Sequence, residues 1–154
     1  MKKIILVVMG LCLFGTAYAK KPSAPKASEL GQLFLLQGEA IRANGTKNAM
    51  LKPGENILSG DRILTGQKSV AIIVFKDGGR LKLGPESAVQ LAKNDCFLEK
   101  GTVFSYVTSK AKQNPYSLRT SLLVVSTHQG IFFTEIEKKQ WMTVHYGDVE
   151  VINL

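Results

Sequence analysis

The stretch SGDRILTGQKSVAIIVFKDGGRLKLGPES, from Ser59 to Ser87, decides the fold. Its middle part, Ser69 to Phe75, is rich in β-branched and apolar residues, which is typical of a strand and too short for an ordinary helix. Apolar side chains occupy both faces of this strand, Val70, Ile72 and Val74 on one and Ala71, Ile73 and Phe75 on the other. We therefore predict that the strand lies inside a sheet and is covered on both faces.

Turn signals flank this strand on both sides. Asp77-Gly78-Gly79 predicts a hairpin, because glycine adopts a positive φ without a Cβ clash. The returning strand, Arg80–Leu83, alternates polar and apolar residues, so one of its faces is expected to be wet. Upstream, Gly60-Asp61 predicts a turn in which the aspartate carboxylate accepts hydrogen bonds from nearby backbone amides.

Short strands are predicted along the rest of the chain as well, and no segment keeps a 3.6-residue apolar stripe. Turn signals, among them Asn44-Gly45 and Lys100-Gly101, separate these strands. Many short strands at near-regular spacing predict an all-β domain, either a two-layer sandwich or jelly roll or, as the alternative, a short β-helix. The predicted strands outside the central stretch are Gln32–Gln37, Ile57–Leu58, Ala88–Leu91, Cys96–Leu98, Thr102–Thr108, Tyr116–Leu118, Leu122–Val125, Ile131–Glu137, Trp141–Tyr146 and Val149–Ile152.

The N-terminus has the pattern of a secretory signal peptide over residues 1–19. An apolar run, Ile4–Phe14, follows two lysines and precedes the A-x-A site Ala17-Tyr18-Ala19. The run is shorter than the roughly 20 residues that a membrane span needs. We expect cleavage after Ala19, a flexible linker over 20–28, a β domain over 29–154, and a periplasmic or secreted product that does not span the membrane.

The chain is basic, with a formal net charge of +8. Removing the leader with its two lysines and no acid leaves 8 − 2 = +6. The basic residues are scattered, and no run of five occurs. This favours a solvated cationic surface, with attraction to peptidoglycan or another anionic envelope polymer as the alternative, and it disfavours nucleic acid as a partner.

Residues able to carry chemistry are few. Cys12 lies in the leader, so the mature chain keeps one thiol, Cys96, which we expect to be a small buried side chain next to the anion Asp95. His145 and Glu150 are close in sequence, but their alternation with apolar residues is typical of a solvated strand face. No nucleophile–base pair, metal-ligand spacing or phosphate-binding loop is visible, so the sequence predicts no catalytic residue, metal or cofactor, and an envelope hydrolase is disfavoured.

Two adjacent phenylalanines, Phe132 and Phe133, must point to opposite faces of a strand. One ring is then available for contact with a partner, unless both are buried between two layers. We predict a partner-binding surface here, formed by Gln129, Gly130, Ile131 and Phe132.

An ordered set of glycines and polar residues runs through the chain. The set is Gly60-Asp61-Arg62-Ile63-x-Thr65-Gly66-x-x-Ser69, Ile72-x-x-Phe75-x-Asp77-Gly78, Leu83-x-Pro85-x-Ser87, Leu98-x-x-Gly101 and Thr143-Val144-x-x-Gly147-x-Val149-x-Val151. It resembles the FecR domain, the periplasmic module of iron-responsive transmembrane regulators. The chain departs from the family pattern at Ser121, which replaces a proline, and at Gln129 and Ile131, which replace an arginine and a threonine.

The resemblance implies a recognition role. We therefore expect a non-catalytic interaction or sensing module that docks another protein of the cell envelope. A binder of the cell wall or of an anionic polymer is the alternative. Any family role that depends on the missing arginine is not expected here, because glutamine cannot supply a guanidinium charge.

Overall fold

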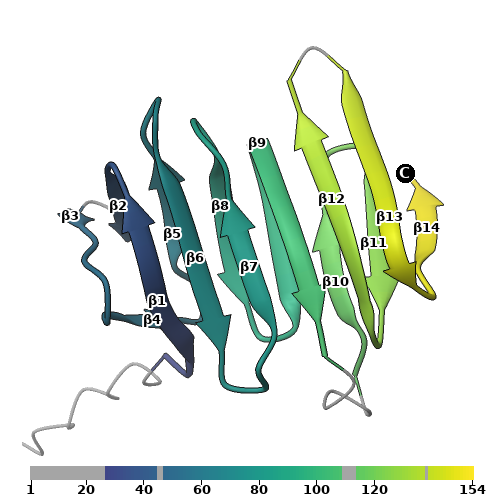
Figure 1. The fold of residues 1–154 in the computed structure, drawn as a ribbon, viewed down its shortest axis with the longest axis horizontal. Coiled ribbons are helices and arrows are strands. Elements are labelled where there is room, and N and C mark those ends of the chain that lie inside the picture. Colours follow the sequence, from purple (N-terminus) through teal and green to yellow (C-terminus); the bar gives the residue numbers. More distant parts are fainter. Residues whose placement is uncertain (1–26, 45–46, 109–113, 138) are drawn as a thin grey trace, which may run out of the picture.

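The computed structural model describes residues 27–44, 47–108, 114–137 and 139–154 (Figure 1). The predicted signal peptide, 1–19, and all but the last two residues of the predicted linker lie outside these ranges. All regular secondary structure in the described part is β-strand, so the predicted all-β class is confirmed. The described residues contain no helix of the length and apolarity needed to cross a membrane.

The strands are short, apart from β9. In chain order they are β1 (Glu29–Gln37), β2 (Ala40–Asn44), β3 (Lys47–Met50), β4 (Asn56–Leu58), β5 (Arg62–Thr65), β6 (Val70–Phe75), β7 (Arg80–Leu83), β8 (Ala88–Ala92), β9 (Asp95–Val107), β10 (Tyr116–Arg119), β11 (Leu123–Thr127), β12 (Gly130–Ile136), β13 (Gln140–Gly147) and β14 (Glu150–Asn153).

All of these strands belong to one curled sheet with two layers. Layer A has the order β4-β1-β6-β7-β9-β12-β13, and layer B has the order β3-β2-β5-β8-β9-β10-β11-β14. Neighbours pair antiparallel except β9 and β10, which are parallel. The two layers lie one behind the other in the view of Figure 1, and both run from β3 and β4 at one end of the long axis to β13 and β14 at the other. Antiparallel pairing agrees with the predicted two-layer build and not with a β-helix, which stacks parallel strands.

Strand β9 connects the layers because it belongs to both. Its first half pairs with β8 and β10, and its second half pairs with β7 and β12. The sequence predicted two strands separated by a turn at Lys100-Gly101, which is wrong, since one strand continues through this point. Gly101 has a φ of +87° and lets the strand bend without ending. The Ser87 hydroxyl lies against the bend, accepting from the Thr102 amide at 2.9 Å and donating to the Thr102 carbonyl at 3.0 Å.

The sequence analysis missed the hairpin of β2 and β3. It marked Asn44-Gly45 as a turn but predicted no strand beside it, because AIRAN and KNAM have few β-branched residues and no clear alternation. Backbone pairing explains the hairpin: β2 bonds both β3 and β5, so its main-chain groups are satisfied on both sides.

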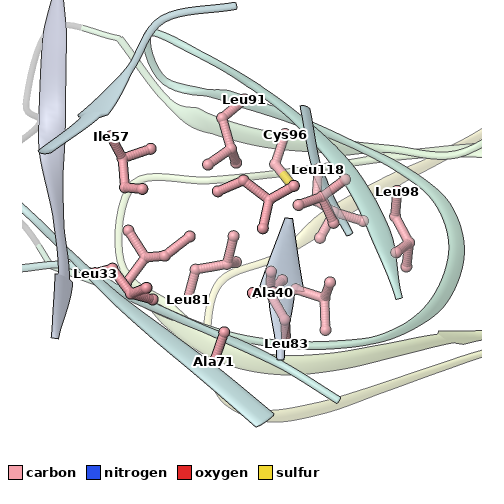
Figure 2. Packing of buried hydrophobic residues seen from close by; sticks show 14 of the residues in the cluster. Leu33, Ala40, Ile57, Ala71, Leu81, Leu83, Leu91, Cys96, Leu98 and Leu118 are labelled. Atoms are coloured by element: carbon pink, nitrogen blue, oxygen red, sulfur yellow. The ribbon is translucent and has the colours of Figure 1, made fainter. Parts of the chain in front are cut away.

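The core lies between the two layers, where side chains from both point at one another (Figure 2). Layer A contributes Leu33, Ala71, Leu81 and Leu83, and layer B contributes Leu91, Cys96, Leu98 and Leu118, all buried. Burial of this apolar surface is the dominant stabilising term, at roughly 25 cal/mol per Å².

Strand β6 differs from its prediction on one face. It lies inside layer A between β1 and β7, as predicted. Its inward side chains Ala71 and Ile73 are fully buried. The other face, with Ile72 and Val74, is only half-buried, because no third layer covers it. An apolar outer surface therefore remains on layer A.

Candidate binding face

Six outer side chains of layer A form a regular patch. The strand register sets Ile72 of β6 opposite Lys82 of β7, and Lys82 opposite Phe104 of β9. The adjacent row runs from Val74 through Arg80 to Tyr106 in the same order. We call Ile72, Val74, Arg80, Lys82, Phe104 and Tyr106 the layer-A patch. It has a central column of two cations, with an aliphatic column on one side and an aromatic column on the other.

The layer-A patch lines a groove. Phe34 of β1 joins its six side chains in a hollow of about 440 Å³. Phe34 sits at an irregularity in β1 between Leu33 and Leu35, and its side chain is 69 % exposed. Tyr106 is 42 % exposed at the aromatic side. Apolar surface of this kind, rimmed by polar groups, marks interaction sites in soluble proteins.

The two cations of the patch have no anionic partner in the described part of the chain. The ion pairs there use Arg42, Arg62, Lys76 and Arg119 as their cations. Strand β7 presents Arg80 and Lys82 on its exposed face, as its alternation predicted. The groove therefore combines apolar walls with positive charge that no described carboxylate neutralises.

The outer face of layer B is arranged differently. Arg62 donates from Nε to Glu99 Oε1 at 2.7 Å and from Nη2 to Oε2 at 2.5 Å. The Arg62 hydrogen bond lowers the pKa of the Glu99 carboxyl, against a smaller opposing effect of burial. Arg119 pairs with Asp95 through two contacts of the same kind. The two acids that β9 carries on this face, Asp95 and Glu99, are thus paired within the protein.

The polar residues of the central stretch hold loops in place. Asp61, 2 % exposed, accepts from the Leu58 amide at 2.8 Å, which confirms the predicted turn. The Asp61 carboxylate also lies 3.1 Å from Arg42 Nε, in a contact outside hydrogen-bond angles. These contacts hold the turn and the neighbouring strand in place.

Two buried hydroxyls of the same stretch, those of Thr65 and Ser69, also bond the backbone. Thr65 Oγ1 donates to the Gly84 carbonyl at 2.6 Å and accepts from the Ser87 amide at 2.9 Å. Ser69 Oγ accepts from the Glu39 amide at 2.8 Å. The polar residues of the central stretch therefore stabilise the loops of the fold.

Cys96 is buried, as the sequence predicted, with an exposed fraction of 0 %. Burial raises the pKa of its thiol to about 12, against a smaller opposing effect of the nearby Tyr116 hydroxyl. The negative charge of the adjacent Asp95 also raises this pKa, by less than burial does. A thiol that stays protonated is a poor nucleophile.

Within the described residues, no group of three or more His, Cys, Asp or Glu side chains is placed to hold a metal ion. His145 lies instead on the outer face of layer A, with its ring centroid 5.9 Å from that of Phe104. It therefore extends the aromatic side of the face toward β13.

The structure distributes the predicted partner-binding residues over both faces of β12. Gln129 is exposed, Gly130 is buried, and Ile131 is half-buried on the outer face. Phe132 is fully buried and packs against Tyr116, with ring centroids 6.3 Å apart. The expectation of an exposed Phe132 ring is thus wrong, because its strand position points between the layers. A partner-binding role for Gln129 and Ile131 stays a prediction, and Ile131 pairs with Tyr106 at the border of the layer-A patch.

Sequence reasoning missed the layer-A patch although the signal was present. Strand β6 is apolar on both faces, which led to the prediction that a layer covers each of them. A two-layer protein leaves one face of each layer to solvent, so an apolar outer face is itself the sign of a binding surface. The alternation in β7 shows which face is wet and therefore where the patch lies.

Comparison with known families gives one finding. The sequence model of the family described as FecR protein matches residues 61–150. These 90 residues (150 − 61 + 1) are more than half of the 154-residue chain and include the layer-A patch. Comparison with curated proteins gave no match, and comparison with solved structures gave none either. The chain therefore belongs to the FecR family.

Proposed function

We propose that this protein is exported to the cell envelope and works there as a non-catalytic module that docks another envelope protein through the outer face of layer A. The family suggests a periplasmic regulatory or sensing role and is itself non-catalytic. To this family role we add that the chain is exported and that it docks through the outer face of layer A.

One observation carries the proposal: an apolar groove on an otherwise complete two-layer fold. Ile72 and Val74 remain half-buried beside an exposed Phe34. Holding such side chains at a surface is unfavourable for a free protein, at about 0.8 kcal/mol for each CH₂ left in water. A partner that covers them recovers this energy, and aromatic side chains supply much of the binding energy at protein interfaces.

The non-catalytic part rests on how the polar groups are used. The buried oxygens of Asp61, Thr65 and Ser87 bond the backbone, and the buried Cys96 thiol is kept protonated. These groups are buried and engaged in holding the fold, which supports a structural role for them. The groove itself presents two cations and a phenol, which suit recognition better than general acid–base work at neutral pH.

Export is tested by sequencing the N-terminus of the protein recovered from the periplasm. We expect the sequence to begin at Lys20, after the Ala17-Tyr18-Ala19 site. A mature N-terminus at a lipid-modified Cys12, or an uncleaved leader, would contradict this part of the proposal.

Docking is tested by crosslinking in intact cells, followed by recovery of the tagged protein and identification of the attached protein. The Phe34→Ser variant should lose the adduct, because it removes an exposed ring from the groove. Leu122→Ser is the matched control, since Leu122 is also exposed, at 60 %, but lies in the turn between β10 and β11. Both variants should melt like the wild type. Equal adducts in all three proteins would refute docking through this face.

A further inference from the structure

We infer that the docked segment is acidic as well as apolar: an extended stretch of the partner protein with carboxylates two residues apart, next to bulky apolar side chains. This inference rests on the proposed function and specifies the chemistry of the partner. It rests on Arg80 and Lys82, the two cations of the layer-A patch. No carboxylate of the described residues forms an ion pair with either of them.

The spacing of the column fits an extended peptide. Arg80 and Lys82 are two residues apart on one strand, so their side chains leave the sheet about 7 Å apart on the same face. Carboxylates at positions i and i+2 of an extended peptide share this spacing. The guanidinium of Arg80 can hold a carboxylate with two parallel hydrogen bonds, whereas Lys82 acts as a point charge.

The flanking columns require apolar neighbours in the partner. Ile72 and Phe104 lie one strand away from Lys82 on either side, about 5 Å distant in the sheet. Side chains next to the carboxylates of the peptide would lie over these columns. The bound peptide would exclude water from the apolar side chains around the ion pairs. This lowers the local dielectric constant and therefore strengthens the ion pairs.

A glycan strand fits the patch less well. The patch offers polar atoms only from Arg80, Lys82 and the Tyr106 hydroxyl, and its other members are hydrocarbon. Sugar hydroxyls covering Ile72 and Val74 would lose water without gaining a partner, which is costly. Peptide side chains can be apolar where the patch is apolar.

An anionic membrane surface fits less well too. Recognition of anionic lipid relies on clusters of about four to eight basic residues. The patch carries two, Arg80 and Lys82. The observations therefore favour an acidic protein segment over a membrane.

The test selects binders from a phage library of random nine-residue peptides on the folded, mature protein. We expect enriched peptides to contain two acidic residues at i and i+2 together with aromatic or large aliphatic residues. Binding of a selected peptide should weaken by about tenfold or more in an Arg80→Glu/Lys82→Glu variant, as two ion pairs become repulsions. Selection on this variant should instead enrich lysine and arginine.

The control is Lys52→Glu/Lys100→Glu, which makes the same change in net charge with two exposed lysines outside the patch. It should bind the selected peptides like the wild type. Thermal melting of both double variants checks that each is folded. Equal weakening in the two would mean that overall charge, not the patch, attracts the peptide, and would overturn the inference.

Further outcomes separate this inference from the proposed function. Enrichment of peptides without acidic residues, no enrichment at all, or binding only to peptidoglycan sacculi or to vesicles containing phosphatidylglycerol would each overturn the acidic-segment inference. An adduct that is lost in Phe34→Ser cells but retained in the Arg80→Glu/Lys82→Glu variant would overturn the inference while leaving docking through layer A intact.

Discussion

The two halves of strand β9 have similar inward chemistry and different charges on their outward faces. Inward, Cys96 and Leu98 in the first half and Val103 and Val107 in the second are all buried. Outward, the first half carries Phe97 and two acids, Asp95 and Glu99, and arginines of the same layer pair with both acids. The second half carries Phe104 and Tyr106 beside two cations without a described anion.

This difference shows which half has a surface completed within the protein. The acids that β9 carries outward in layer B are paired with arginines of the same layer. The layer-A patch combines uncovered apolar area with two cations that no described carboxylate pairs, and the proposed partner would satisfy both. The two halves are therefore expected to respond differently to substitution, as the following predictions state.

The largest expected effect concerns the core beside the second half of strand β9. Phe132→Ala should destabilise the protein by about 4 kcal/mol, because it removes a fully buried ring and leaves a cavity. Its neighbour Phe133, half-buried on the outer face opposite Phe104, should lose only about 1 kcal/mol when changed to alanine. Urea unfolding of both variants measures the difference. Similar losses would mean that the layers do not enclose Phe132.

The next effect concerns the bend that joins the halves. Gly101→Ala should cost about 3 kcal/mol, since a Cβ there would lie 2.5 Å from Ser87 Cα at a φ of +87°. Gly54→Ala is the control that measures the cost of a positive φ alone. Gly54 has a φ of +85°, but no atom lies within 4 Å of a Cβ placed there. We expect about 1 kcal/mol for Gly54, measured by chemical denaturation. A loss at Gly54 equal to that at Gly101 would remove the close contact from the explanation.

A smaller effect concerns the inward side of the first half. The folded-state pKa of Cys96 is raised by burial to about 12, so the unfolded chain releases the thiol proton first as the pH rises. Stability should therefore fall above the ordinary thiol pKa of about 8.5, by about 1 kcal/mol between pH 7.5 and 9.5. Cys96→Ala should lack this part of the pH dependence. An unchanged slope in Cys96→Ala would contradict a buried, protonated thiol.

The smallest effect concerns the outward side of the first half. The Arg62 hydrogen bond lowers the folded-state pKa of Glu99, so its stabilisation is present above the ordinary glutamate pKa of about 4.3 and is lost as the pH falls below it. Glu99→Gln should cost under about 1 kcal/mol at pH 7, because the pair is partly exposed, and less at pH 3. Lys82→Gln should leave stability unchanged at both values. A loss for Lys82→Gln as large as that for Glu99→Gln would show that the patch cation is already neutralised within the fold.

Much of the fold could be predicted from the sequence because it follows from local signals. The Asp77-Gly78-Gly79 hairpin, the alternation of β7 and the short apolar runs each fix a strand without knowledge of its neighbours. The bend at Gly101 and the β2–β3 hairpin could not be predicted, because both depend on which strand lies alongside. Ser87 and the pairing of β2 with β5 supply that information only in the folded chain.

The candidate site could not be predicted for a related reason. Its members come from β6, β7 and β9, and only the register brings Ile72, Lys82 and Phe104 into one row. The pair Phe132-Phe133 drew attention to one ring pointing outward, but the side facing the core depends on the register with β9. The chemistry of each residue was visible in the sequence, whereas their proximity was not.

The most direct test of the account places a photo-crosslinking amino acid at one of two outward positions of the same strand, Tyr106 or Phe97, in cells. Both positions lie on β9, one in each layer. We predict that light attaches a specific envelope protein to the chain from position 106 and not from position 97, with both variants folded. Equal attachment from both positions, or attachment from position 97 alone, would contradict a docking face on layer A.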